Sequence, residues 1–202
     1  MTEQLREMEK TTYLLIGLGN PGREYRGNRH NIGFMVLDHL AAKMGLTFSR
    51  MESKALVTKG DLQGHRLVLA KPQTYMNLSG QAVRALMNFY KIPLENLLVI
   101  YDDVDLPFET MRLRPQGGSA GQKGVQSIIE NLGTSDFSRL RIGIGRPPGQ
   151  MQAADYVLQN FSKAELDILP FILQRSTEAV ITYVTNDIET AMNKFNASQE
   201  IT

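Results

Sequence analysis

Residues 13–19, YLLIGLG, decide the fold of this chain of 202 residues. The run from Tyr13 to Ile16 is apolar and leads into glycines, a pattern typical of a short buried strand. Strands of this kind occur mainly in parallel sheets whose two faces are covered by helices. We therefore expect this strand to lie inside an α/β fold, and we interpret the segments around it on that basis.

Hydrophobic periodicity beyond this strand predicts helices that alternate with further strands. The expected strands are residues 55–59, 65–70, 96–103, 111–114 and 139–145. The expected helices are residues 31–44, 79–90, 121–133 and 163–195, the last with breaks at Pro170 and at residues 185–187. Residues 60–64 are rich in turn formers and predict a hairpin, which makes the sheet mixed.

This order of elements predicts a single α/β domain with a mixed, mostly parallel twisted sheet and helices on both faces. We assign residues 13–195 to that domain, residues 1–12 to a flexible leader and residues 196–202 to a C-terminal tail. A hydrophobic content of 42% supplies enough apolar side chains for a sizeable core.

The composition excludes several classes of site and location. The chain has no cysteine, which rules out disulfides, cysteine nucleophiles and thiolate metal sites. Its N-terminus is polar and lacks the apolar region of a secretory signal. No stretch approaches the roughly 18 apolar residues of a membrane span. We therefore expect a cytoplasmic protein that has no contact with membranes.

The overall charge is nearly neutral, with 22 Lys and Arg against 21 Asp and Glu. Binding of a nucleic acid would therefore depend on a local basic patch. Cations concentrate in one part of the chain, at Arg112, Arg114, Lys123, Arg139, Arg141 and Arg146. A solvated basic face without a partner is the alternative interpretation of this cluster.

The glycines that follow the first strand match G-x-G-x-x-G at residues 17–22, the pattern of dinucleotide-binding proteins. In those proteins a helix begins at once, so that its N-terminus meets the pyrophosphate. Here the next residues, REYRGNRHN, indicate a loop, and Asp38 lies within a helical pattern. We therefore reject a dinucleotide site and interpret the glycines as a turn.

His30 lies where this loop becomes a helix, close to the carboxyl end of the first strand. Ligands of α/β sheets bind at that end, and a histidine there can act as a general base. Asp102, at the end of the strand 96–103, can orient such a base. A magnesium site and a solvated acidic turn are the alternatives for the acids Asp102, Asp103 and Asp105. Because G-x-S-x-G is absent, a His–Asp pair would activate water directly.

Two further loops carry polar groups that suit a ligand. Residues 71–80, KPQTYMNLSG, place the amides of Gln73 and Asn77 beside Tyr75. Asn77 or Ser79 can instead serve as the N-cap of the following helix. Residues 117–124, GGSAGQKG, are glycine-rich and lead into a helix, which favours an anionic ligand, with a flexible loop as the alternative.

Together these segments resemble the bacterial-type peptidyl-tRNA hydrolases, cytoplasmic enzymes of translation that recycle tRNA from prematurely released peptidyl-tRNA. The resemblance covers roughly residues 13–195 and includes the family's order and spacing of motifs. Its motifs are GLGNPGREYRGNRHNIGF (17–34), KPQTYMNLSGQAV (71–83), DDVDLP (102–107), GGSAGQKG (117–124) and RLRIGIGRP (139–147).

The resemblance implies a role for each matching residue. His30 would be the general base, Asp102 its orienting carboxylate, and Asn20 the amide that helps to separate N-blocked from free aminoacyl-tRNA. Other matches imply contacts with the 3′ end of the tRNA or with the peptide, at Tyr25, Tyr75 and Asn77. Arg114 and Arg141 match the residues that clamp the 5′-phosphate of the acceptor stem. The family also implies a monomer that needs no metal and no cofactor.

One motif departs from the family pattern. The glycine loop usually ends in His-Asn-Gly, whereas this chain has Gln122-Lys123-Gly124. Lys123 therefore stands where an asparagine normally binds the substrate, and lysine offers donors but no acceptor. A catalytically silent RNA-binding member of the same fold is the alternative function. The presence of His30, Asp102, Asn20 and Asn77 together favours the ester hydrolase, because a protein that only binds RNA need not keep that set.

Overall fold

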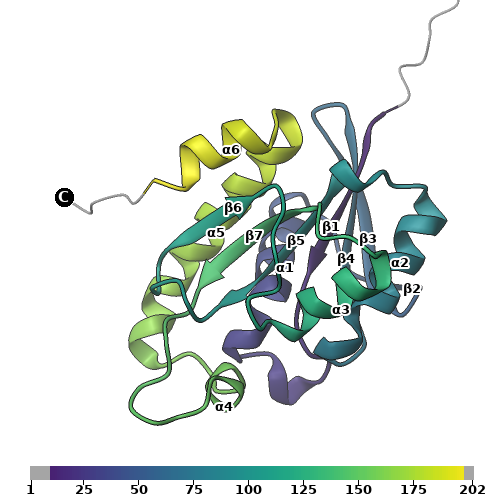
Figure 1. Cartoon of the computed structure of the whole chain (residues 1–202). Coiled ribbons are helices and arrows are strands. Elements are labelled where there is room, and N and C mark those ends of the chain that lie inside the picture. The colour runs from purple at the N-terminus through teal and green to yellow at the C-terminus, as the bar shows by residue number, and fades with distance from the viewer. Residues whose placement is uncertain (1–9, 198–202) are drawn as a thin grey trace, which may run out of the picture.

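The strand expected at residues 13–19 forms as β1 (Thr12–Gly17) in the computed structural model, which describes residues 10–197 (Figure 1). It lies at the centre of a seven-stranded sheet with the order β2-β3-β4-β1-β5-β7-β6. The other strands are β2 (Arg50–Glu52), β3 (Ala55–Leu62), β4 (His65–Pro72), β5 (Leu97–Asp103), β6 (Met111–Arg114) and β7 (Ser138–Gly143).

The sheet is mixed, as the sequence predicts. Strands β4, β1, β5 and β7 run parallel and form its centre. The edges are antiparallel, with β2 and β3 on one side and β6 on the other. The β3–β4 hairpin is longer than expected, because the strands continue to a two-residue turn at Gln63 and Gly64. Both turn residues have positive φ, 46° and 87°, the conformation that tight hairpins favour.

Helices cover both faces of the sheet (Figure 1). They are α1 (Ile32–Lys43), α2 (Ser79–Tyr90), α3 (Lys123–Leu132), α4 (Ala153–Val157), α5 (Lys163–Thr185) and α6 (Ile188–Phe195). Short 3-10 helices are η1 (Arg23–Tyr25), η2 (Arg29–Asn31), η3 (Met76–Leu78) and η4 (Leu94–Asn96). Leu15 packs in a core cluster with α1 and α5, whereas Leu14 and Ile16 pack with α2 and α3. The predicted α/β fold class is confirmed.

The predicted break at Pro170 was wrong, because α5 continues through this residue from Lys163 to Thr185. Proline removes one hydrogen bond from a helix interior. Leu169 and Ile172, on either side of it, are buried in the core and stabilise the helix by packing. The predicted break at residues 185–187 is confirmed, since Asp187 is the N-cap of α6. The strand β2 and the helix α4 were not predicted.

The ends of the predicted domain differ slightly from the structure. Thr12 already belongs to β1, and residues 1–9 of the predicted leader lie outside the described residues. Residues 198–202 of the predicted tail also lie outside them. Asn196 follows α6, and its side chain accepts from the Leu113 N–H (2.7 Å) and donates to the Leu113 carbonyl (3.1 Å). These bonds satisfy backbone groups on the edge strand β6.

A glycine contact places the start of α1 against the ends of two strands. A Cβ atom on Gly33 would lie 2.3 Å from the Ile100 carbonyl oxygen of β5. A Cβ atom on Gly17 would lie 2.3 Å from the Gly33 carbonyl oxygen. The backbones of α1, β1 and β5 therefore touch directly. Because η2 directly precedes α1, it lies over the carboxyl ends of the strands and contacts β5.

We predict that Gly33→Ala destabilises the protein, by about 1–3 kcal/mol as expected for overpacking. The added methyl group must displace main-chain atoms, which cannot move as a flexible side chain would. Urea denaturation compares this variant with Gly118→Ala, whose Cβ would meet nothing within 4 Å. Helix propensity alone favours alanine over glycine. A more stable Gly33→Ala variant would therefore contradict the proposed backbone contact.

Candidate functional site

A cavity of about 520 Å³ opens at the carboxyl ends of the parallel strands. Most of the site residues expected from the sequence line it, namely Asn20, Tyr25, His30, Tyr75, Asn77, Asp102 and Lys123. The remaining lining comes from Met76, Asp103, Val104, residues 119–122, Ala153, Ala154, Val157 and Leu158. The loops after β1 and β4, the end of β5 and the start of α3 thus meet at one place.

His30 and Asp102 form a direct contact in this cavity, although 72 positions separate them in the chain. His30 Nδ1 lies 2.8 Å from Asp102 Oδ2, and the two side chains are 11% and 2% exposed. A carboxylate only accepts hydrogen bonds, so the Nδ1–H donates to it. In the neutral imidazole, this tautomer leaves Nε2 as the acceptor. The structure thus brings together the two residues that the sequence analysis paired.

Asn20 is held by hydrogen bonds that fix its orientation. Its Oδ1 accepts from the Met76 backbone N–H at 2.9 Å. The Asn31 side chain accepts from the Asn20 N–H and donates to its carbonyl, both at 2.9 Å. With Oδ1 engaged, the side chain presents its Nδ2 donor to the cavity that it lines. Asn31, which directly follows His30, was not singled out in the sequence.

The other lining residues lie nearer the rim. Tyr25 is half-buried, whereas Tyr75, Asn77 and Lys123 are exposed. Asn77 belongs to η3, and the N-cap position of α2 is Leu78, which makes no capping bond through its side chain. The N-cap interpretation of Asn77 and Ser79 is therefore not supported, and Asn77 is available to a ligand.

The start of α3 differs from the expected anion site. Gln122 is the N-cap of this helix, and its side-chain oxygen accepts from the backbone N–H groups of Gly124 and Val125. These donors are thus already satisfied within the protein. The Gln122 amide nitrogen donates to Asp102 Oδ1 at 3.1 Å, so that both oxygens of Asp102 are held.

Arg114 and Arg141 lie outside the cavity, on the adjacent strands β6 and β7. Arg114 is exposed, whereas Arg141 is partly buried and its Nε donates to Asp103 Oδ2 at 2.6 Å. Arg139, opposite Arg114 in the register, is 1% exposed and donates to the carbonyls of Gly118 and Ser135. Burial lowers the pKa of the Arg139 guanidinium from its ordinary value. Part of the cationic cluster therefore has a structural role.

The acids at the end of β5 have separate partners. Asp102 binds His30 and Gln122, Asp103 binds Arg141, and Asp105 forms an ion pair with Arg146. Among residues 10–197, no group of three or more His, Asp or Glu side chains is arranged to hold a metal ion. The contacts of these acids favour orientation of His30 over the magnesium site considered above.

Comparison with known proteins agrees with this geometry. A family model described as peptidyl-tRNA hydrolase matches residues 14–202. The chain belongs to the peptidyl-tRNA hydrolase family. The peptidyl-tRNA hydrolase of Chloroflexus aggregans is 52% identical over 185 residues, which cover 91% of this chain and 98% of the relative. That of Exiguobacterium sibiricum is 47% identical over 182 residues, which cover 90% and 98%.

A solved structure extends the agreement to the fold. The crystal structure of peptidyl-tRNA hydrolase from Acinetobacter baumannii matches with a TM-score of 0.86 and 34% identity. The match covers 93% of this chain and 96% of the other. The resemblance to bacterial-type peptidyl-tRNA hydrolases is thus confirmed. No helix within residues 10–197 combines the length and apolar character that crossing a membrane requires.

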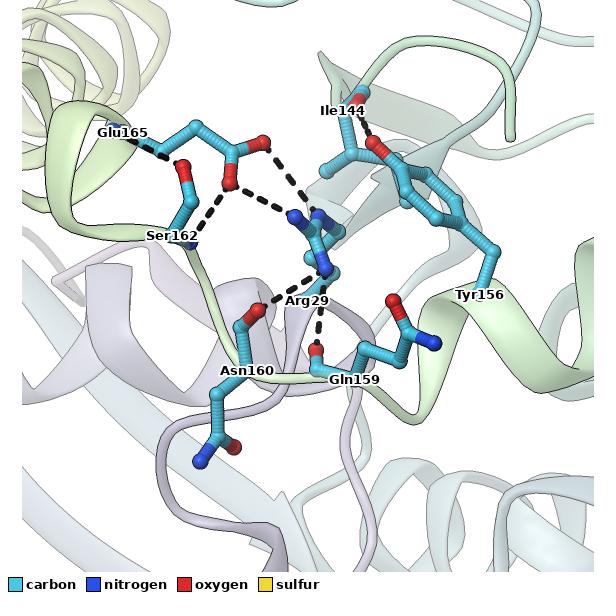
Figure 2. Close-up of polar contacts among 7 residues, drawn as sticks. All are labelled: Arg29, Ile144, Tyr156, Gln159, Asn160, Ser162 and Glu165. Atoms are coloured by element: carbon cyan, nitrogen blue, oxygen red, sulfur yellow. Dashed lines mark hydrogen bonds and ion pairs between the residues drawn. The ribbon is translucent and has the colours of Figure 1, made fainter. Parts of the chain in front are cut away.

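The cavity wall of this family member includes α4, a helix that was not predicted from the sequence. Arg29 anchors the segment that follows α4, as Figure 2 shows. Its guanidinium lies 4.3 Å from the ring centre of Tyr156, donates to the Asn160 carbonyl at 2.9 Å, and pairs with Glu165 at 2.6 Å. Because Arg29 precedes His30 directly, the anchor ties the α4 wall to the backbone that carries His30.

Glu165 completes this anchor and has a lowered pKa. Burial alone would raise the pKa of its carboxyl group, but hydrogen bonds from Ser162 and Arg29 to the carboxylate outweigh burial. The contribution of Glu165 to stability is therefore fully present above its ordinary pKa of 4.5. It is lost as the pH falls through the lowered value in the folded protein.

We predict that Glu165→Gln lowers the free energy of unfolding by about 3 kcal/mol at pH 7, because Arg29 then stays buried without its counter-charge. Glutamine can retain the capping contact with Ser162. Urea denaturation of both proteins between pH 7 and pH 3 measures the difference. This difference shrinks below about pH 4.5 if the ion pair is responsible. A difference that stays constant down to pH 3 would assign the loss to packing.

Proposed function

We propose that His30 activates the water molecule that attacks the ester bond of peptidyl-tRNA, and that Asp102 orients His30 for this step. Hydrolysis of peptidyl-tRNA is the function that the family and its solved structures support for this chain. The observation that carries the mechanism is the 2.8 Å contact between His30 Nδ1 and Asp102 Oδ2 inside the cavity.

The reaction needs only protein groups and water in this proposal. The water oxygen attacks the ester carbonyl carbon while His30 Nε2 takes one of its protons. The buried carboxylate of Asp102 stabilises the imidazolium that forms. The bond to the ribose oxygen then breaks, and the imidazolium returns the proton to that oxygen. The products are a tRNA with a free ribose hydroxyl and a peptide whose new carboxyl group keeps the second proton of the water and then loses it to solvent.

Amides are suited to the remaining demands of this step. Asn20 lines the cavity, and its Oδ1 already accepts from the Met76 N–H. Its Nδ2 group can therefore donate to a substrate carbonyl or to the developing oxyanion. A donor of this kind contributes roughly 3–4 kcal/mol in favourable cases. Asn77 provides a second amide at the rim. Because amides bind main-chain groups, we expect little preference among peptide sequences.

Residues around the cavity suit the tRNA. Tyr25 and Tyr75 offer aromatic faces for stacking with the unpaired 3′ end. Lys123 begins α3 at the cavity and supplies an ammonium donor where the family pattern has an amide. Arg114 and Arg141 lie on adjacent strands, and we assign the 5′-phosphate of the acceptor stem to them. A silent RNA-binding role would place no demand on the His30–Asp102 contact, so we favour the hydrolase.

We predict that His30→Ala reduces turnover of N-acetyl-aminoacyl-tRNA by about 10²–10⁴-fold, the usual contribution of a general base. Asp102→Asn reduces it less, because the side chain keeps its shape and loses the charge that stabilises the imidazolium. Release of the acetyl amino acid measures turnover. Gel-shift binding of tRNA serves as the control for substrate binding and stays near wild type, and the Tm checks that each variant is folded at the assay temperature. Full activity in His30→Ala would eliminate this mechanism.

We predict that Arg114→Ala raises KM for peptidyl-tRNA and flattens its dependence on salt, with little change in kcat. The 5′-phosphate is remote from the ester, so losing its contact should not slow the chemical step. Arg66→Ala is the matched control, since Arg66 is exposed at the amino end of β4, away from the cavity. On a substrate without the 5′-phosphate, most of the difference between Arg114→Ala and wild type disappears. A penalty that persists there would refute the assignment.

A further inference from the structure

Gln122 lies between the first turn of α3 and the catalytic pair. Its Oε1 accepts from the backbone N–H groups of Gly124 at 2.6 Å and Val125 at 2.9 Å. Its Nε2 donates to Asp102 Oδ1 at 3.1 Å and also lies 3.4 Å from Met76 Sδ. We propose that Gln122 is a positioning residue for the hydrolysis, which holds the Asp102 carboxylate in the orientation that His30 requires.

The two ends of the Gln122 amide face partners of opposite character. Backbone N–H groups can only donate, so the amide oxygen must face Gly124 and Val125. The amide nitrogen then faces Asp102, whose ionised carboxylate can only accept. Turning the amide over would set donor against donor at the helix and oxygen against oxygen at the aspartate. The cap of α3 therefore determines which atom Gln122 presents to Asp102.

Asp102 depends on this donor because its side chain is only 2% exposed. One carboxylate oxygen is held by His30 and the other by Gln122. A buried acceptor without its donor is costly, and hydrogen bonds to charged groups are stronger than neutral ones. Without the Gln122 donor the carboxylate can rotate, and its contact with His30 Nδ1 loosens. The consequence is a slower chemical step, with little change in the binding of substrate.

Gln122 also stands where the chain departs from the family pattern. Glutamine supplies one acceptor oxygen and one donor nitrogen, and it carries no charge at any pH near neutral. A histidine in the same place has a donor and an acceptor only in its neutral form. In this chain, therefore, the contact to Asp102 and the cap of α3 both come from a group that does not titrate.

The experiment separates the cap from the contact with Asp102. Gln122→Ser keeps an N-cap oxygen for α3 but cannot donate to Asp102, because its side chain is too short. Gln122→Ala loses both the cap and the donor. We expect kcat for N-acetyl-aminoacyl-tRNA to fall by about tenfold or more in both variants, with KM nearly unchanged. The Tm falls further in Gln122→Ala than in Gln122→Ser, because only the alanine variant also loses the cap of α3. Wild-type kcat in Gln122→Ser would overturn the proposal and leave Gln122 as a helix cap alone.

A double variant tests whether Gln122 acts through Asp102. If it does, Gln122→Ser costs much less in an Asp102→Asn background, because the charged acceptor is already gone. Losses that multiply fully in single-turnover measurements would overturn the proposal. The inference rests on the proposed role of Asp102, and different results would refute the role of Asp102 and the role of Gln122. Full activity of Asp102→Asn refutes the mechanism, whereas impaired Asp102→Asn with fully active Gln122→Ser refutes the role of Gln122 only.

Discussion

The direct contact between the backbones of α1, β1 and β5 is the constraint on which the site depends. Gly33 and Gly17 lie so close to main-chain atoms that a Cβ on either would fall 2.3 Å from a carbonyl oxygen. This approach brings the end of η2, and with it His30, over the end of β5, where Asp102 lies. At α3, Gly124 instead leaves room for side chains, since its Cβ would lie 2.5 Å from Met76 Sδ. Glycine at the start of α1 thus allows the close approach that brings His30 to Asp102.

Polar interactions form a closed ring around the cavity. The ring runs through Asn20, Met76, Gln122, Asp102, His30 and Asn31, the last two being neighbours in the chain. It joins the loops after β1 and β4, the end of β5 and the start of α3. Hydrogen bonds in such networks polarise and strengthen one another. The positions of the base and of the Asn20 amide are therefore coupled, although they contact different parts of the substrate in our proposal.

The sequence alone predicts the central strands and the sheet edge at which His30 and Asp102 lie, because local patterns of residues indicate both. The apolar run of β1 and the acids that end β5 place His30 and Asp102 at the same edge of the sheet, and the structure joins them. The continuity of α5 through Pro170 was not predictable, because it depends on packing against the sheet. The anchor between Arg29 and Glu165 was also missed, since nothing local connects residues 136 positions apart. Long-range contacts of this kind leave no periodic signal in the chain.

The alternation of side chains along β5 explains how adjacent acids take different roles. Successive residues of a strand point to opposite faces of the sheet. Asp102 lies on the side of Ile100 and the α1 core, where it meets His30, whereas Asp103 lies on the side of Tyr101 and binds Arg141. One strand end thus orients the proposed base and also fixes the proposed phosphate ligand. In this proposal, the distance between ester chemistry and phosphate recognition is therefore set by the sheet itself, which is more rigid than a loop.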